Sequence, residues 1–436
     1  MRDAGGSEPE IVKNLQTENI TTPSISLSWE KPDGNASSYF IQILEVPSFN
    51  WTSITTSKII EGLTPGNYYT FLVSAVVNNI SGNSSVIACY TVPGEVKNLT
   101  TKDINTTSIS LSWDIPGGNV SHYLIEMYGP EVLDFTVYTN SAVIGDLSPG
   151  NHYLFLVYVI VDGNTARGNS SDVSAYTFPS IVTNLTAEII STTYVSLSWE
   201  PPVGNTSSFM IQVLHNSSYN RNVTSTSAII DHLTPGNYYT FLVSAVVDDL
   251  VKGNDVNLSL YTKPEIVNNL QTENITTTSI SLSWEKPDGN ASSYFMQILG
   301  DPSFNTTSNS TTSDIIERLT PGNYYTFLVS ALVNNIRGKN SVITNFTVPE
   351  QVTNLTAENI TTNSISLSWE KPDGNASSYF IQILGDPSFN RTVTSTSYVI
   401  SNLIPGNYYM LLVSAVVGEN NVTGEAETTY TYTGES

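Results

Sequence analysis

The seven-residue pattern L-x-P-G-N-x-Y occurs five times in this chain, and it constrains the fold more than any other feature of the sequence. A tryptophan precedes each copy, and these tryptophans lie 84, 86, 85 and 85 positions apart, at Trp29, Trp113, Trp199, Trp284 and Trp369. A fixed period marks an internal repeat, and this period is too long for the unit of a solenoid. We therefore predict five small domains, each with a hydrophobic core of its own.

The hydrophobic pattern within each repeat predicts β-strands. In the first repeat Ile25, Leu27 and Trp29 alternate with serines, which is the period of a strand with one buried face. The last residue of the motif begins a similar strand in every repeat, at Tyr69, Tyr153, Tyr239, Tyr325 and Tyr409. Short strands, frequent turn signals and no helical period predict an all-β sandwich. In such a sandwich we expect the tyrosine ring to be buried and its hydroxyl to bond to upstream backbone.

The phrases W-E-K-P-D-G-N and L-T-P-G-N-Y-Y-T-F-L-V resemble the fibronectin type III module, and the resemblance extends from about residue 9 to residue 433. It implies five tandem seven-stranded immunoglobulin-like β-sandwiches that form an extended rod. A proline lies near each boundary, which predicts domains over 9–93, 94–179, 180–264, 265–349 and 350–433, an unstructured leader over 1–8 and a tail over 434–436. Phrases such as S-I-S-L-S-W, and the many N-x-S/T triplets, are also similar to ectodomains of receptor-type tyrosine phosphatases of the density-enhanced, eta-like group.

The charge balance excludes several classes of partner. The chain has 39 Asp and Glu against 16 Lys and Arg, a formal net charge of −23. Binding to nucleic acid requires a basic stripe, which this sequence lacks, and the same argument disfavours heparin and anionic membranes. The longest apolar run, residues 154–161, is shorter than the roughly 18 residues of a membrane span. The amino terminus lacks the apolar segment of a signal peptide, so we expect this chain to be part of a longer extracellular protein.

We find no residue pattern of a catalytic, cofactor or metal site. The single cysteine, Cys89, lies in a strand and not in the H-C-x-x-G-x-x-R loop that a tyrosine phosphatase needs. The four histidines are dispersed, and no group of residues has the spacing of metal ligands. We expect no enzymatic activity from this chain. Because Cys89 aligns with Asn345, which begins an N-x-S/T triplet, we expect its thiol to face outward, either free or in an intermolecular disulfide.

Asparagine triplets predict N-glycosylation. The pattern N-x-S/T occurs 24 times, and chance in a chain rich in these residues is the alternative explanation. One set recurs after the tryptophan of every repeat, which favours use: Asn35, Asn119, Asn205, Asn290 and Asn375. Further candidates are Asn50, Asn98, Asn184, Asn345 and Asn354. Glycosylation at these positions implies an extracellular or cell-surface location.

A second set of apolar residues is predicted to point away from the core. In the first repeat these candidate interface residues are Phe40, Leu44, Leu72 and Val76, and the divergent second repeat adds Leu154 and Tyr158. They would form a surface for lateral adhesion or dimerisation, unless neighbouring side chains or glycans cover them. Two loops, at Arg167-Gly168-Asn169 and Arg337-Gly338-Lys339, lack the acidic residue of an integrin-binding R-G-D, so we expect no integrin contact through them.

These features predict an extracellular binding and spacer region of a cell-surface receptor. Its partner would be an extracellular protein or glycan ligand, or a second copy of the chain, with no nucleic acid and no membrane span within these residues. The resemblance implies the ectodomain part of a receptor-type tyrosine phosphatase without its catalytic domain. The alternative is a secreted or matrix adhesion protein that has no enzymatic linkage and uses its five domains for multivalent contact.

Overall fold

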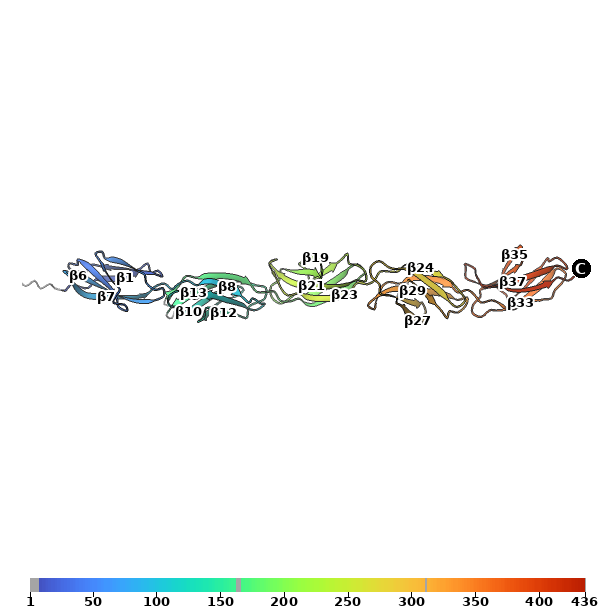
Figure 1. Ribbon diagram of the computed structural model, residues 1–436, viewed down its shortest axis with the longest axis horizontal. Coiled ribbons are helices and arrows are strands. Elements are labelled where there is room, and N and C mark those ends of the chain that lie inside the picture. Colours follow the sequence, from blue (N-terminus) through green and yellow to red (C-terminus); the bar gives the residue numbers. More distant parts are fainter. Residues whose placement is uncertain (1–7, 162–165, 310–311, 436) are drawn as a thin grey trace, which may run out of the picture.

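The computed structural model describes residues 8–161, 166–309 and 312–435, so the predicted leader up to residue 7 and Ser436 lie outside the described residues. Five β-sandwiches follow one another along a single axis from the amino to the carboxyl end (Figure 1). We number them modules 1 to 5, using the predicted ranges as working boundaries. The described residues contain strands and no helix, so no helix there is long and apolar enough to cross a membrane.

Each module packs a smaller three-stranded sheet against a larger sheet. Module 1 consists of β1 (Lys13–Glu18), β2 (Ser24–Glu30) and β5 (Ser57–Glu61) in the smaller sheet, and β4 (Asn50–Ser53), β3 (Ser38–Ile43), β6 (Tyr68–Val77) and β7 (Ile80–Tyr90) in the larger. In module 2 the smaller sheet is β8 (Lys97–Lys102), β9 (Ile109–Asp114) and β12 (Ser141–Ile144). Its larger sheet is β11 (Val132–Val137), β10 (His122–Tyr128), β13 (His152–Val161), β14 (Ala166–Arg167) and β15 (Ser171–Tyr176).

The remaining modules repeat the arrangement of module 2. Module 3 has β16 (Thr183–Ile190), β17 (Val195–Glu200) and β20 (Ser227–Ile230), packed on β19 (Asn216–Val223), β18 (Ser208–Val213), β21 (Tyr238–Val247), β22 (Val251–Lys252) and β23 (Val256–Tyr261). Module 4 has β24 (Asn268–Glu273), β25 (Ile280–Glu285) and β28 (Ser313–Ile316), packed on β27 (Asp301–Ser308), β26 (Ser293–Ile298), β29 (Tyr324–Val333), β30 (Ile336–Arg337) and β31 (Ser341–Phe346). Module 5 has β32 (Thr353–Glu358), β33 (Ser364–Glu370) and β36 (Ser397–Ser401), packed on β35 (Asp386–Val393), β34 (Ser378–Ile383), β37 (Tyr408–Val417), β38 (Val422–Thr423) and β39 (Glu427–Tyr432).

Modules 2 to 5 have an eighth short strand because their last strand is divided at a glycine, although β7 of module 1 continues through the equivalent Gly82. In module 2 the amide of Gly168 donates to Val159 O (2.9 Å) between β14 and β15, whereas β7 of module 1 is continuous. A Cβ on Gly168 would lie 3.0 Å from Pro93 O, so the glycine allows the strand to pass close to the linker proline. The expected seven-stranded sandwich is thus present, with its last strand divided in four modules.

Each module has a separate core, and the alternation in the sequence accounts for it. Trp29 lies between the sheets, buried, with its ring edge against Tyr39 (centroids 5.2 Å apart). The other four tryptophans take the same buried place, and their ring partners are Tyr123, Phe209, Tyr294 and Tyr379. Five independent cores explain why the tryptophan recurs once per module.

The L-x-P-G-N-x-Y motif forms a turn held by hydrogen bonds from both ends. In module 1 the amide of Thr64 donates to the hydroxyl of Tyr69 (2.9 Å), as the sequence predicts. The equivalent bonds reach Tyr153, Tyr239, Tyr325 and Tyr409 at 2.9, 2.9, 2.8 and 2.9 Å. A second bond, from the Thr91 hydroxyl to Thr64 O (2.7 Å), joins the turn to the end of the last strand.

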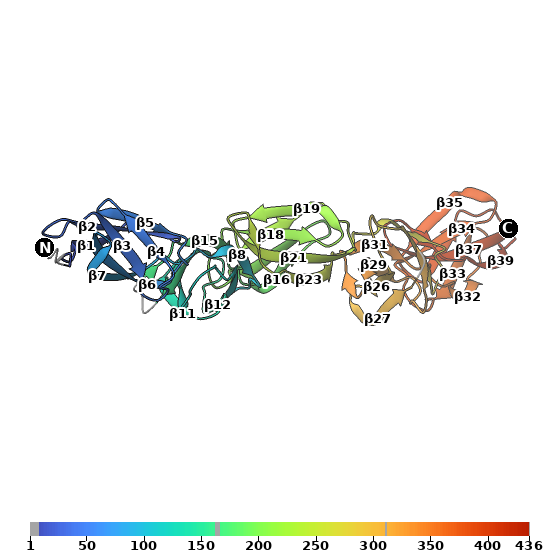
Figure 2. The same cartoon turned by 60° about the vertical axis from the view of Figure 1, so that its left-hand side comes forward.

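Successive modules are turned about the axis of the rod. The strands β19, β27 and β35 occupy equivalent places in modules 3, 4 and 5, and they lie above, below and above the axis in both Figure 1 and Figure 2. In modules 3 to 5, equivalent faces of neighbouring modules therefore point to different sides, and modules 3 and 5 face the same side.

Candidate interaction surfaces

The side of each larger sheet that faces away from the core is here called the outer face. The predicted residues Phe40, Leu72 and Val76 lie on the outer face of module 1, half-buried, and Leu44 beside them is 56% exposed. Polar residues separate them, because Phe40 is paired with Ser74 across the strands and Leu72 with Gln42. The expected apolar patch is therefore interrupted in module 1.

Module 2 carries more apolar and aromatic side chains on this face, although Glu126 lies among them where module 1 has Gln42. Tyr158 takes the place that Ser74 has in module 1 and is paired with Leu124, while Tyr128 is paired with Leu154. Cross-strand pairs are direct neighbours on a sheet face, so these aromatic and aliphatic side chains adjoin. Both predicted residues, Leu154 and Tyr158, are half-buried on this face.

A charged network crosses the same face. The guanidinium of Arg167 lies over the ring of Tyr158, with Cζ 3.4 Å from the centroid, and Nη2 donates to Glu126 Oε1 (2.9 Å). The hydroxyls of Tyr158 and Tyr128 donate to Glu126 Oε2 at 3.1 and 3.2 Å. Burial opposes ionisation of Glu126, but the bonds from Arg167 and Tyr158 outweigh it and lower the pKa of the carboxyl. Both tyrosines are thereby held in fixed orientations.

The two arginine-glycine loops are explained by packing. Arg337 lies over the ring of Phe295 (Cζ 4.1 Å from the centroid) and donates from Nε to Ser330 Oγ (2.7 Å), as Arg167 lies over Tyr158 in module 2. A Cβ on Gly338 would lie 2.6 Å from Pro264 O. The arginine thus covers the outer face and the glycine admits the linker, so the pair has a structural role in both modules.

Nine of the ten candidate glycosylation asparagines are exposed, and two sets have structural roles as well. Asn98, Asn184 and Asn354 lie at a β-bulge with φ of 52°, 53° and 55°, which asparagine tolerates better than most residues. Asn14 and Asn269 take the same conformation (φ 48°) at equivalent bulges, although neither begins an N-x-S/T triplet. The backbone therefore explains asparagine at this position without a glycan.

Four members of the recurring set after the tryptophan lie at the joints between modules, and Asn35 has the same place in module 1, where no described module meets it. The serine of the triplet is anchored, as Ser37 Oγ donates to Val76 O (2.7 Å). Across the joint, the side-chain amide of Asn119 donates from Nδ2 to Asn67 Oδ1 in the preceding module (2.7 Å). Recurrence of the triplet thus has a structural cause, independent of any glycan. The equivalent exposed residues are Asn35, Asn205, Asn290 and Asn375.

The expectation that Cys89 faces outward is wrong. Cys89 is paired with Tyr69 across β6 and β7, and paired residues point to the same face, so the thiol lies half-buried against the core of module 1. Asn345 has the same place opposite Tyr325 and donates from Nδ2 to Thr272 Oγ1 (2.9 Å). The error came from treating a triplet at Asn345 as evidence of exposure. Burial raises the pKa of the Cys89 thiol, which disfavours the reactive thiolate.

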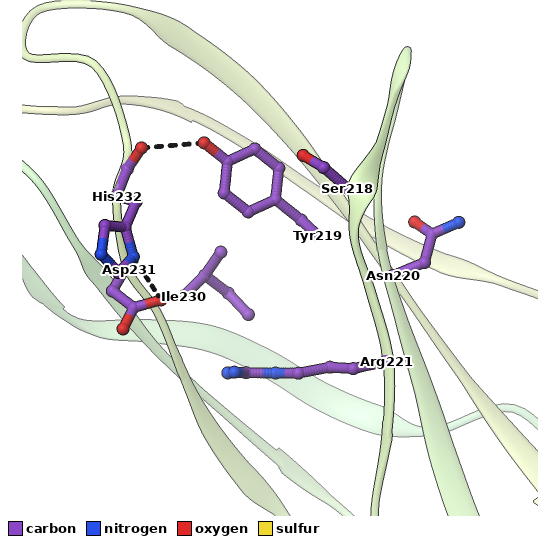
Figure 3. Close-up of a pocket in the computed structure, with 7 residues that line it drawn as sticks. All are labelled: Ser218, Tyr219, Asn220, Arg221, Ile230, Asp231 and His232. Atoms are coloured by element: carbon purple, nitrogen blue, oxygen red, sulfur yellow. Dashed lines mark hydrogen bonds and ion pairs between the residues drawn. The ribbon is translucent and has the colours of Figure 1, made fainter.

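A cavity of about 340 Å³ opens in module 3 between β19 and β20, the facing edge strands of the two sheets (Figure 3). Ser218, Asp231 and His232 line it, which is the residue set of a hydrolase triad. Their geometry differs, because Ser218 Oγ donates to Asn216 Oδ1 (2.7 Å) and His232 pairs with its exposed neighbour Asp231 (3.3 Å). The hydrogen bond with His232 lowers the pKa of Asp231. The cavity is an open edge of the sandwich without a positioned nucleophile. Among the described residues, no group of histidine, cysteine or acidic side chains could hold a metal ion.

Sequence reasoning missed the threonine that fixes each motif turn. One buried threonine per module donates its hydroxyl to the backbone of the turn. These threonines are Thr91, Thr177, Thr262, Thr347 and Thr433. The available signal is an aromatic residue followed by threonine at the end of every repeat, as in Tyr90-Thr91.

Comparison with known proteins agrees with this architecture. The family model "Fibronectin type III domain" matches residues 7–88, 94–175, 180–252, 262–347 and 350–431. Receptor-type tyrosine-protein phosphatase eta of Gallus gallus is 31% identical over 98% of this chain and 32% of its own length. Receptor-type tyrosine-protein phosphatase H of Homo sapiens is 34% identical over 93% of this chain and 38% of its own. Tenascin-N of Mus musculus is 23% identical over 95% of this chain and 28% of its own.

Among solved structures, a two-domain fibronectin type III segment of chicken tenascin is 20% identical, with a TM-score of 0.32, and covers 38% of this chain and 99% of that one. The chain spans about a third of the length of the two phosphatase relatives. All five matched segments are of one kind, and no phosphatase catalytic domain lies in this chain. The chain belongs to the fibronectin type III family as a tandem array of five domains, similar to parts of the receptor-type tyrosine phosphatases eta and H.

Proposed function

We propose that the chain is an N-glycosylated extracellular binding and spacer region of a receptor-type tyrosine phosphatase. The observation that carries the binding role is the outer face of module 2, where Tyr128 is paired with Leu154, Arg167 covers Tyr158, and Glu126 joins the two tyrosines. Tyrosine and arginine are enriched among residues that dominate binding energy, and fixed aromatic side chains lose little entropy on contact. The relatives' printed names support the receptor assignment, and the string of similar modules supports the spacer role.

Mutation of the outer face of module 2 tests the binding role. Leu154→Lys and Tyr158→Ser in the full chain should reduce binding of labelled protein to ligand-bearing cells, and reduce self-association in sedimentation velocity. Val143→Lys is the matched control, because Val143 is a 72% exposed valine on the smaller sheet of the same module. Equal behaviour of the control and the two test variants would contradict the assignment.

Expression through a secretory pathway tests glycosylation and location. We expect a gel shift after glycosidase treatment, with modified asparagines at exposed triplets such as Asn35 and Asn50. Asn345 should be modified least, because its amide is half-buried and bonded to Thr272. Secreted material without a shift would contradict the proposal.

A soluble or matrix adhesion protein is the second candidate, favoured by tenascin relatives that match over 94 to 95% of this chain. Sequencing the complete transcript distinguishes the two. A membrane span and a phosphatase domain in the same reading frame support the receptor, and a termination codon without them supports the adhesion protein.

A further inference from the structure

The same contact joins every pair of neighbouring modules. The amide of Asn119 in module 2 donates to Pro65 O in module 1 (3.0 Å), across the boundary. The equivalent bonds at the other three joints are Asn205 to Pro149 (2.9 Å), Asn290 to Pro235 (3.0 Å) and Asn375 to Pro321 (3.0 Å). Each joint thus places the P-G-N turn of one module on the G-N loop of the next.

Glycines on both sides permit this approach. A Cβ on Gly322 would lie 1.9 Å from Asn375 O, and a Cβ on Gly374 would lie 2.3 Å from Pro321 O. Separations below about 3 Å are inside van der Waals contact, so any side chain at either position would force the modules apart. The partner is therefore selected by backbone shape, which only glycine on both surfaces provides.

Side chains add to the backbone contact. The amide of Asn375 donates from Nδ2 to Asn323 Oδ1 (3.0 Å), and that of Asn290 to Asn237 Oδ1 (3.2 Å). On another side of a joint, the Tyr176 hydroxyl of module 2 donates to Asp248 Oδ2 of module 3 (2.8 Å). Contacts on separate sides resist bending in more than one direction.

The terminal modules each show one half of the joint without its partner: the P-G-N turn in module 5 and the G-N loop in module 1. In module 5 the turn residues Pro405, Gly406 and Asn407 are exposed, whereas Gly66, Gly150, Gly236 and Gly322 are buried. Gly406 has the φ of its counterparts, 64° against 66° for Gly322, and a Cβ there would meet only Glu435 Cγ at 4.0 Å. In module 1, a Cβ on Gly34 would have no neighbour within 4 Å.

We infer that the P-G-N turn is an interaction surface whose partner is the G-N loop of another fibronectin type III module. The turn therefore serves two purposes: its tyrosine and threonine fix it within a module, and its proline carbonyl and glycine dock the next module. Docking at four successive joints holds the five modules in one extended arrangement. The asparagine of each G-N loop begins an N-x-S/T triplet, so a glycan there would lie beside the joint.

The test compares glycine variants in the full chain. Gly322→Ala introduces the same backbone strain as Gly406→Ala, but only Gly322 has a module against it. Gly374→Ala and Gly34→Ala form a second pair that approaches the same joint from the other side. The readouts are hydrogen exchange of the Asn375 amide and the maximum dimension from small-angle X-ray scattering.

We expect Gly322→Ala and Gly374→Ala to increase exchange at Asn375 by about tenfold or more, the effect of losing a hydrogen bond and its local order. Both should shorten the maximum dimension of the chain, while Gly406→Ala and Gly34→Ala leave both readouts unchanged. Exchange at core amides of module 4, such as Phe327, shows whether Gly322→Ala has unfolded the module. If Gly322→Ala has unfolded module 4, the comparison of Gly374→Ala with Gly34→Ala decides whether the joint is a docking contact. Equal effects within each pair, or wild-type dimensions in all four variants, would overturn the inference.

Discussion

A single hydroxyl group accounts for much of the order in each motif turn, and Thr262 of module 3 shows how. Its Oγ1 donates to Thr234 O (2.7 Å) and accepts from the Asn237 amide (3.0 Å), while its side chain is fully buried. Thr262→Val keeps the shape and leaves both backbone groups without this partner. We expect the free energy of unfolding of module 3 to fall by about 1–3 kcal/mol, the cost of unsatisfied buried groups. Hydrogen exchange at Phe241 in the full chain measures this, and Thr262→Ser should retain most of the stability. An equal loss in the serine variant would assign the effect to the methyl group.

At this scale the sequence predicts residues whose partners are close along the chain. The tyrosine hydroxyl bonds to an amide five residues upstream, so the motif itself contains both partners. Thr262 bonds to a residue 28 positions away, and only the folded sheet brings them together. The joints between modules are harder to predict still, because the sequence shows the two glycines but not that their backbones meet across a module boundary.

At the scale of strands, the period of two predicts which residues face the core, and register decides the exceptions. The alternation places Tyr39, Phe71 and Val73 correctly between the sheets. It gives no clear answer on β7, where Ile87 to Tyr90 are all half-buried. For Cys89, pairing with Tyr69 shows that the side chain points toward the core. Alignment with the asparagine triplet at Asn345 gave the opposite and wrong direction.

The position of Cys89 predicts that its thiol reacts slowly with thiol reagents. The thiol lies against the core, and burial raises its pKa, so the thiolate forms only at higher pH than for an exposed cysteine. We expect a thiol reagent at pH 7 to react with the native chain at least about tenfold more slowly than with the chain in denaturant, because local opening must come first. The native rate should rise with pH. A non-reducing gel should show monomer, and a native rate equal to the denatured rate would show that the thiol is exposed.

At the scale of the whole molecule, joints and charge act together. Joints that repeat in all four linkers extend the chain, and the alternating rotation of modules 3 to 5 turns their equivalent outer faces to different sides. Two outer faces in adjacent modules of this part therefore cannot both meet one flat partner. Among the described residues, a tyrosine takes the place of the outer-face serine in module 2 alone, so contact along the side of the rod should involve one module at a time.

The net charge of −23 sets the long-range force between two such rods. At low ionic strength, about 0.01 M, the Debye length is near 30 Å, so the negative charges of two copies act on each other across that distance. The two copies therefore repel before their surfaces touch. We expect a positive second virial coefficient by light scattering that falls as salt rises toward about 0.5 M, where screening leaves short-range apolar contact dominant. Leu154→Lys should show the same fall at low salt but less attraction at high salt, because it alters the patch and barely changes the total charge. Attraction that is strongest at low salt would mean that complementary charges, and not the outer face of module 2, bring the copies together.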